Sequence, residues 1–89
     1  MAQTNNVPFN MGKKPMFALQ KDINKEVTIK LKNSLVYKGL MLNVDIYMNV
    51  YLQNADEYNE EGKRLTNYGD IIIRGNNILY IQANEGLLK

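Results

Sequence analysis

Apolar and polar residues alternate along much of this chain, and a period of two predicts β-strands. The first such run covers residues 26–32, in which every second side chain is apolar. The second covers residues 36–44. In a regular strand, one face of this run would carry Val36, Lys38, Leu40, Leu42 and Val44, and the other Tyr37, Gly39, Met41 and Asn43.

Three further strands are predicted at residues 48–53, 66–74 and 77–82. Between the first two of these, residues 56–64 (DEYNEEGKR) are highly charged, contain a glycine and show no apolar period. We therefore expect a solvated hairpin loop there, with its acidic side chains facing water.

A helical period precedes the strands. Met16, Leu19 and Ile23 recur at helical spacing after Pro15, a residue that suits the first turn of a helix, and Asn24 is a suitable end point. The pattern predicts an amphipathic helix of about two to three turns whose apolar stripe lies on the sheet.

The end of the fourth predicted strand and most of the fifth lie in residues 71–81 (IIIRGNNILYI), which we interpret as strand, turn, strand. Gly75, Asn76 and Asn77 tolerate the positive φ that a tight turn needs. Both strands contain consecutive apolar residues, so both of their faces need cover. In a chain of 89 residues we expect the second cover to come from another subunit.

The order of these elements predicts a mostly β fold. Gly39 lies within the second strand, where a missing side chain permits a sharp bend. We expect a short N-terminal α-helix on a five-stranded, strongly bent antiparallel sheet, which is a small open barrel. Such a sheet has exposed edges, and head-to-tail pairing of these edges between copies would close a ring.

Composition narrows the possible functions. The chain has neither cysteine nor histidine, which excludes disulfides, Cys-ligated zinc and thiol catalysis and removes the usual general base. A net charge of +2 is compatible with nucleic acid without demanding it. We therefore expect no enzyme activity, no cofactor and no metal site.

Residues 1–12 are rich in polar side chains and show no apolar period, so they are expected to form a flexible arm. One domain is expected over residues 13–83 and a tail over residues 84–89. No apolar run is as long as a membrane span, and the N-terminus lacks the apolar core of a signal peptide. We expect a cytoplasmic protein that also enters the nucleus in a eukaryotic cell.

Candidate chemistry lies in two turns, residues 45–49 and 74–77. Tyr47 can stack on a nucleobase, Asn49 can form hydrogen bonds with a base edge, and Arg74 can cover the opposite base face. These residue types favour recognition of single-stranded nucleic acid over a chemical reaction.

Other residues near these turns have structural interpretations. Asp45 is expected to stabilise its own loop as an Asx residue, and Gly39 and Asn77 to shape the backbone. Arg74 has an alternative role, a salt bridge with a carboxylate such as Asp70, and this stretch alone leaves the two roles equally open.

The two turns together resemble the two-part signature of the Sm and Sm-like (LSm) family. The matching residues are Asp45-x-Tyr47-Met48-Asn49 after Gly39, and then Ile73-Arg74-Gly75-Asn76-Asn77-Ile78. The resemblance covers about residues 13–83 and looks most like an archaeal Sm-like protein. The eukaryotic LSm subunit that corresponds to SmF is the close second, because it shares the RGNN turn and the preceding YGD.

The resemblance implies a ring, commonly of seven subunits, whose lumen binds U-rich single-stranded RNA and which acts as a scaffold or chaperone in RNA processing. A homoheptamer fits the archaeal alternative, and a hetero-heptamer in mRNA decay or U6 snRNA binding fits the eukaryotic one. It further implies that Tyr47 and Arg74 sandwich a uracil and Asn49 contacts its edge, with Gly75 and Asn76 completing the RNA site.

Three positions depart from the family pattern. Tyr47 stands where many archaeal members have His, and Asn76 where many have an Asp that would orient Arg74. Ile46 stands where a small or polar residue is common. Two other classes of function stay open: a purely structural assembly module without RNA, and a hydrolase using Asp70 with Asp45, for which no activated nucleophile is paired with a base.

Overall fold

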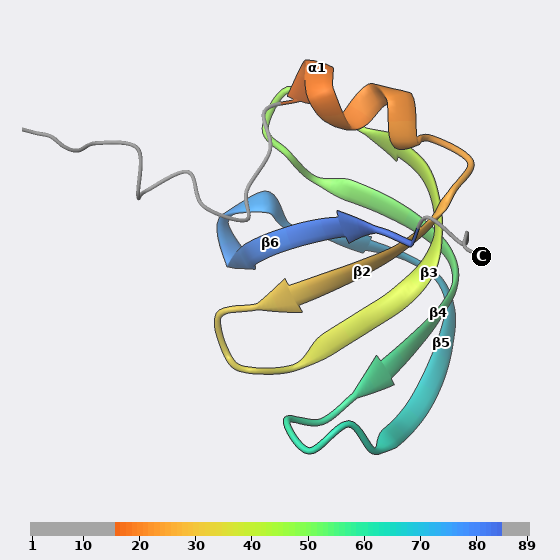
Figure 1. Cartoon of the computed structure of the whole chain (residues 1–89), viewed down its shortest axis with the longest axis vertical. Coiled ribbons are helices and arrows are strands. Elements are labelled where there is room, and N and C mark those ends of the chain that lie inside the picture. Colours follow the sequence, from red (N-terminus) through yellow and green to blue (C-terminus); the bar gives the residue numbers. More distant parts are fainter. Residues whose placement is uncertain (1–15, 85–89) are drawn as a thin grey trace, which may run out of the picture.

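The computed structural model describes residues 16–84, so the predicted arm and nearly all of the predicted tail lie outside it. The elements are α1 (Met16–Leu19), η2 (Gln20–Asp22), β2 (Glu26–Leu31), β3 (Val36–Val44), β4 (Val50–Tyr58), β5 (Arg64–Ile73), η3 (Gly75–Asn77) and β6 (Ile78–Ala83). The strands form one antiparallel sheet in the order β5-β4-β3-β2-β6, and it curves strongly around its core (Figure 1). The predicted fold class is confirmed.

The concave face of the sheet holds the core, and α1 covers one end of it (Figure 1). Every strand contributes to this core, because the alternating apolar side chains of each strand all turn toward the same interior. The most deeply buried apolar side chains are Leu19, Val27, Ile29, Met41, Val50, Leu52 and Ile78.

Among residues 16–84, the α-helix is shorter than the two to three turns that the sequence predicts. Within the described residues, one turn of α-helix is followed by the 3-10 turn η2, and the backbone becomes extended at Ile23. Asn24 adopts a left-handed φ of 72° and donates its N–H to the carbonyl of Met41 at 2.7 Å. This hydrogen bond to the sheet replaces the next helical one. Leu19 and Ile23 still pack on the core as expected.

The predicted faces of β3 are wrong beyond its middle. Met41 is fully buried, whereas Leu42 is 40% exposed and Val44 is buried. The pairing with β4 is irregular between Lys38 and Leu40, where the extra residue lies in β4, and between Met41 and Asn43, where it lies in β3. The second irregularity breaks the alternation of β3. The first irregularity coincides with Gly39, where an added Cβ would lie 2.9 Å from the carbonyl oxygen of Gln53.

The predicted loop at residues 56–64 is also wrong at both ends. β4 continues to Tyr58 and β5 begins at Arg64, which leaves a short connection of residues 59–63. Glu57 is only 7% exposed rather than solvated. Bulges around Ala55 shift the register of β4 against β5, and they turn part of this charged segment toward the interior.

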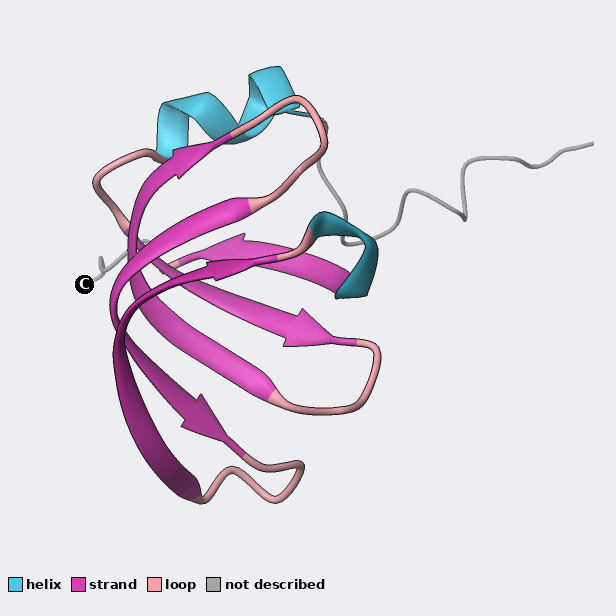
Figure 2. Cartoon of the chain, turned by 180° about the vertical axis from the view of Figure 1, so that it is seen from behind, coloured by secondary structure: helices cyan, strands magenta, loops and turns pink. Residues whose placement is uncertain are grey.

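The apolar stretch at residues 71–81 is not a hairpin. β5 pairs with β4, whereas β6 pairs with β2, and η3 links these two opposite edges of the sheet (Figure 2). The exposed apolar side chains of β5 and β6 include Leu65, Tyr68, Ile72 and Leu79. Both outer edges of the described sheet are therefore unpaired and partly apolar.

Glu57 is held by two tyrosines from neighbouring strands. The hydroxyl of Tyr37 donates to Glu57 Oε2 at 2.5 Å, and that of Tyr68 donates to Oε1 at 3.3 Å. Burial, with the hydrogen bond and charge of Glu57, raises the pKa of Tyr37, and mainly the charge of Glu57 raises the pKa of Tyr68. Each tyrosine thus stays protonated in the folded state at a pH where the unfolded chain loses the proton.

This linkage predicts that folding stability falls as pH rises above the ordinary tyrosine pKa of 10.0. Tyr37→Phe should lower stability near neutral pH by about 1–3 kcal/mol, because a buried carboxylate oxygen loses its donor. The same variant should show a weaker alkaline decline than the parent. Thermal midpoints measured from pH 7 to 11 test both effects. Tyr58→Phe is the control, and an equal alkaline decline in all three proteins would contradict the assignment.

Candidate nucleic-acid interface

The turn between β3 and β4 is organised by the carboxylate of Asp45. Its Oδ1 accepts the backbone N–H groups of Tyr47 and Asn49, each at 2.9 Å, and its Oδ2 accepts the side-chain amide of Asn49 at 3.1 Å. The turn also needs a left-handed residue, Met48, with a φ of 66°. These contacts fix the direction in which the Tyr47 and Asn49 side chains leave the backbone.

Desolvation acts to raise the pKa of Asp45, but its hydrogen bonds with Asn49 and Tyr47 outweigh it and lower the pKa below the ordinary 3.8. Because the pKa is lower in the folded state, this carboxylate stabilises the fold at pH values above its pKa in the unfolded chain. The contribution is lost only as pH falls through the lower folded value. Asp45 is therefore ionised at neutral pH and acts only as a hydrogen-bond acceptor in this turn.

Asn49 connects this turn to η3. Its Oδ1 accepts the backbone N–H of Gly75 at 2.8 Å, while its Nδ2 donates to Asp45. The sequence assigned Asn49 only to a base edge, and the link to Gly75 was missed because 26 residues separate the two along the chain. The pair of contacts also fixes which end of the amide is oxygen and which is nitrogen.

Position 75 needs glycine because another backbone segment lies very close to it, and not because of its φ. The predicted left-handed turn is therefore wrong. Neither Gly75 nor the two following asparagines has a positive φ, and residues 75–77 form a single 3-10 turn. A Cβ on Gly75 would lie 2.2 Å from the carbonyl oxygen of Tyr47 and 2.8 Å from that of Met48. Only glycine allows the two backbones to approach this closely.

The two turns together form a cavity. Tyr47, Asn49, Arg74 and Asn76 line a space of about 380 Å³. Tyr47 is 75% exposed, and Arg74 and Asn76 are exposed as well. The structure thus brings together four of the five residues predicted for RNA contact, and the fifth, Gly75, is buried beneath them.

The alternative role for Arg74 does not match the structure. The ion pairs among residues 16–84 are Lys25 with Asp22 and Arg64 with Asp56, and neither involves Arg74. Asp70 instead accepts the backbone N–H of Asn54 at 3.2 Å. Asn77 shapes its turn, since its N–H donates to the carbonyl of Arg74 at 3.0 Å.

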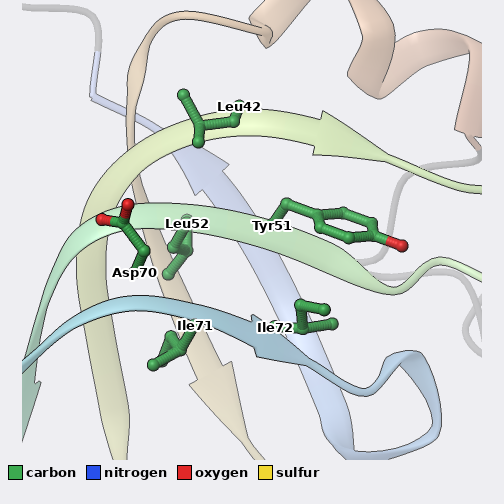
Figure 3. A pocket seen from close by; sticks show the side chains of 6 residues that line it. All are labelled: Leu42, Tyr51, Leu52, Asp70, Ile71 and Ile72. Atoms are coloured by element: carbon green, nitrogen blue, oxygen red, sulfur yellow. The ribbon is translucent and has the colours of Figure 1, made fainter.

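A second cavity of about 320 Å³ has a different character. It lies over β3, β4 and β5 near the open edge and is lined by Leu42, Tyr51, Leu52, Asp70, Ile71 and Ile72 (Figure 3). This surface is largely apolar. It lacks the arginine and amides of the first cavity and is better suited to protein contact than to a nucleic acid.

The described part of the chain has neither a metal-binding cluster nor a membrane-spanning helix. Residues 16–84 hold no cluster of acidic, histidine or cysteine side chains suited to a metal ion. No helix among the same residues is both long and apolar enough to cross a membrane.

A helix-capped, five-stranded bent sheet with a polar cavity between the β3–β4 turn and η3 defines a barrel of the Sm type. The family model described as LSM domain matches residues 18–83. The chain belongs to the LSM domain family, as the two turns indicated.

Similar curated proteins include two fungal proteins named U6 snRNA-associated Sm-like protein LSm6. The one from Botryotinia fuckeliana is 46% identical over 74 residues, covering 83% of this chain and 86% of the relative. The one from Aspergillus fumigatus is 46% identical over 72 residues, covering 81% and 89%.

Similar solved structures include two archaeal Sm proteins. The Pyrococcus abyssii Sm protein in complex with a uridine heptamer has a TM-score of 0.75 and 30% identity, covering 81% of this chain and all of that one. The P. aerophilum SmAP1 heptamer has a TM-score of 0.72 and 31% identity, with coverages of 79% and 92%. Both the archaeal and the eukaryotic branches of the expected resemblance are therefore represented.

The contact between the turns predicts the effect of Gly75→Ala. The added methyl group must push η3 away from Tyr47, so we expect a loss of about 1–3 kcal/mol in stability together with a distorted cavity. Urea unfolding measures the loss. Asn76→Ala is the matched control, because its exposed side chain should leave stability within about 0.5 kcal/mol of the parent. Equal stability of the two variants would show that the turns are not in close contact.

Proposed function

We propose that this protein is a non-catalytic ring subunit that binds U-rich single-stranded RNA and serves as a scaffold or chaperone in RNA processing. The observation that carries the proposal is the cavity shared by Tyr47, Asn49, Arg74 and Asn76. It combines an aromatic plane, a guanidinium plane and fixed amides, which together suit an unstacked base. The proposed domain spans residues 13–83, with flanking segments at 1–12 and 84–89.

Asn49 is the residue proposed to select the base. A carboxamide has two N–H donors and an oxygen with two lone pairs. Asp45 uses one donor and Gly75 uses one lone pair, so one donor and one acceptor of Asn49 remain for a ligand. Because those two contacts prevent the amide from flipping, its free donor and acceptor have a fixed order. A uracil edge, with a carbonyl beside an N–H, can match that order, whereas a cytosine edge presents the reverse.

Tyr47 and Arg74 are proposed to hold the two faces of the base. Stacking is worth about 1–3 kcal/mol per base and tolerates every base type. Arg74 has no carboxylate at position 76 to orient it, so its guanidinium also stays free to neutralise a phosphate. The solved complex of an archaeal Sm protein with a uridine heptamer supports this assignment.

Ring assembly is proposed from the open edges of the sheet. β5 and β6 lie at opposite ends of the strand order and carry Ile72 at 56% and Leu79 at 48% exposure. Pairing of β5 with β6 of a neighbouring subunit gives hydrogen-bond partners to the free backbone groups of both edge strands. Repeated from subunit to subunit, this pairing closes a ring. A homoheptamer is supported by the archaeal heptamer, and a mixed ring that binds U6 snRNA by the LSm6 relatives. The corresponding location is the cytoplasm, and the nucleus as well in a eukaryotic cell.

Three substitutions should affect RNA binding differently. Arg74→Ala should weaken oligo-U binding most, because it removes both a stacking plane and a cation. Tyr47→Ala should lower affinity for all bases, while Tyr47→Phe should be nearly silent. Asn49→Ala removes the base-edge contact and also the bond to Gly75, so it should narrow the difference between oligo-U and oligo-C and lower affinity for every base. Fluorescence anisotropy with short oligo-U, oligo-C and oligo-A measures these effects.

Only variants that keep the parent's assembly size and thermal midpoint are compared. Ile46→Ala is a suitable control, since Ile46 is exposed beside Tyr47 but does not line the cavity. If the three variants bound oligo-U like the parent, the base would bind elsewhere. No binding of any oligonucleotide by the parent would favour the purely structural module.

Assembly has its own prediction. At micromolar concentration, light scattering should give a mass several times that of the 10.3 kDa chain. Leu79→Asp and Ile72→Asp should each produce smaller species, because a charge cannot be buried at a strand interface without a partner. Ile46→Asp, a change of the same type in an exposed loop, should keep the parent's size. A stable parent monomer would contradict ring formation by this chain alone.

A further inference from the structure

The cavity lined by Tyr47, Asn49, Arg74 and Asn76 is called the base cavity below. A third cavity lies next to it, on the side of the β2–β3 loop. It has a volume of about 190 Å³ and is lined by Leu31, Lys32, Asn33 and Asn77. The N–H of Lys32 donates to the carbonyl of Asn77 at 2.9 Å, which attaches this loop to η3. The β3–β4 turn, η3 and the β2–β3 loop consequently follow one another along one side of the barrel (Figure 2).

The chemistry of this cavity suits an anion. Lys32 is exposed, and it takes part in neither of the two ion pairs found within residues 16–84. Asn33 Oδ1 accepts the backbone N–H of Leu35 at 3.0 Å, which leaves the Asn33 amide donors for a ligand. The described residues that line the cavity include no carboxylate. An ammonium and an amide beside a cavity without negative charge favour a phosphate oxygen.

The two cavities are neighbours along η3. Arg74 and Asn76 line the base cavity, and Asn77, the next residue, lines this one. Because the two cavities are lined by consecutive residues of η3, a strand whose base lies in the first cavity passes directly beside the second. The group of that strand that meets a lysine and an amide there is its phosphate.

We propose that Lys32, together with Asn33 and Asn77, binds the phosphodiester next to the base held between Tyr47 and Arg74. The inference rests on the proposed RNA-binding function and assigns Lys32 as a further contact residue of the same strand. Lys32 contributes affinity that depends on salt and not on base identity, since it meets only the backbone.

The test is fluorescence anisotropy on the assembled full-length protein with a short oligo-U, repeated over a series of salt concentrations. Lys32→Ala should weaken binding several-fold at low salt. It should also reduce the slope of log affinity against log salt by about 0.7 for each phosphate that the variant no longer neutralises. Lys32→Arg should keep the parent's slope. Lys63→Ala, which removes an exposed lysine of the β4–β5 loop, should keep both affinity and slope.

An oligo-U with uncharged methylphosphonate linkages separates a phosphate contact from a loop effect. On this probe Lys32→Ala and the parent should bind equally well. An equal loss on the charged and uncharged probes would overturn the inference, as would a Lys32→Ala variant with the parent's affinity and slope. If either result were found while Arg74→Ala still weakened oligo-U binding, the proposed function would stand and only the role of Lys32 would fail. A parent that does not bind oligo-U at all would remove both.

Discussion

The site depends on one hydrogen bond, from the backbone N–H of Gly75 to Oδ1 of Asn49. It joins two turns that come from distant parts of the chain, and each turn is shaped to make it possible. Asp45 holds Asn49 from the other side, and the missing Cβ of Gly75 lets the backbones meet. Without this bond the tyrosine and the arginine would have no fixed relation, and a planar base would have no defined place between them.

The 3-10 turn η3 links RNA recognition to ring assembly. η3 carries Gly75 beneath the base cavity, and it also sends β5 and β6 to opposite edges of the sheet. A hairpin at this position would have paired the two strands with each other, so β5 would no longer be an edge strand. Because they diverge, the described sheet has β5 free at one edge and β6 at the other, and neighbouring subunits of a ring can bring successive base cavities onto a common path. Repeated weak contacts along one strand then add up to useful affinity.

Sequence reasoning succeeded where a local pattern determines the structure. Strict alternation located β2, and the glycine within β3 coincides with an irregularity in the pairing with β4. Prediction from the sequence failed where pairing between distant strands determines which side chains are buried. The irregularity between Met41 and Asn43 reverses the faces of β3, and bulges near Ala55 bury Glu57 within a segment that looks like a loop. The side chains of the candidate site were identified from their types, but the bond between Asn49 and Gly75 was not, because no local pattern encodes a contact across 26 residues.

The central claim is that a base lies between Tyr47 and Arg74, in the cavity that the Asn49–Gly75 bond maintains. Photo-cross-linking tests it directly, with an oligo-U containing one 4-thiouridine bound to the assembled protein and the adduct located by mass spectrometry. Adducts are expected on Tyr47 and on the segment from Arg74 to Asn76. Adducts confined to other surfaces, such as the residues of η2 or the β4–β5 loop, would contradict it.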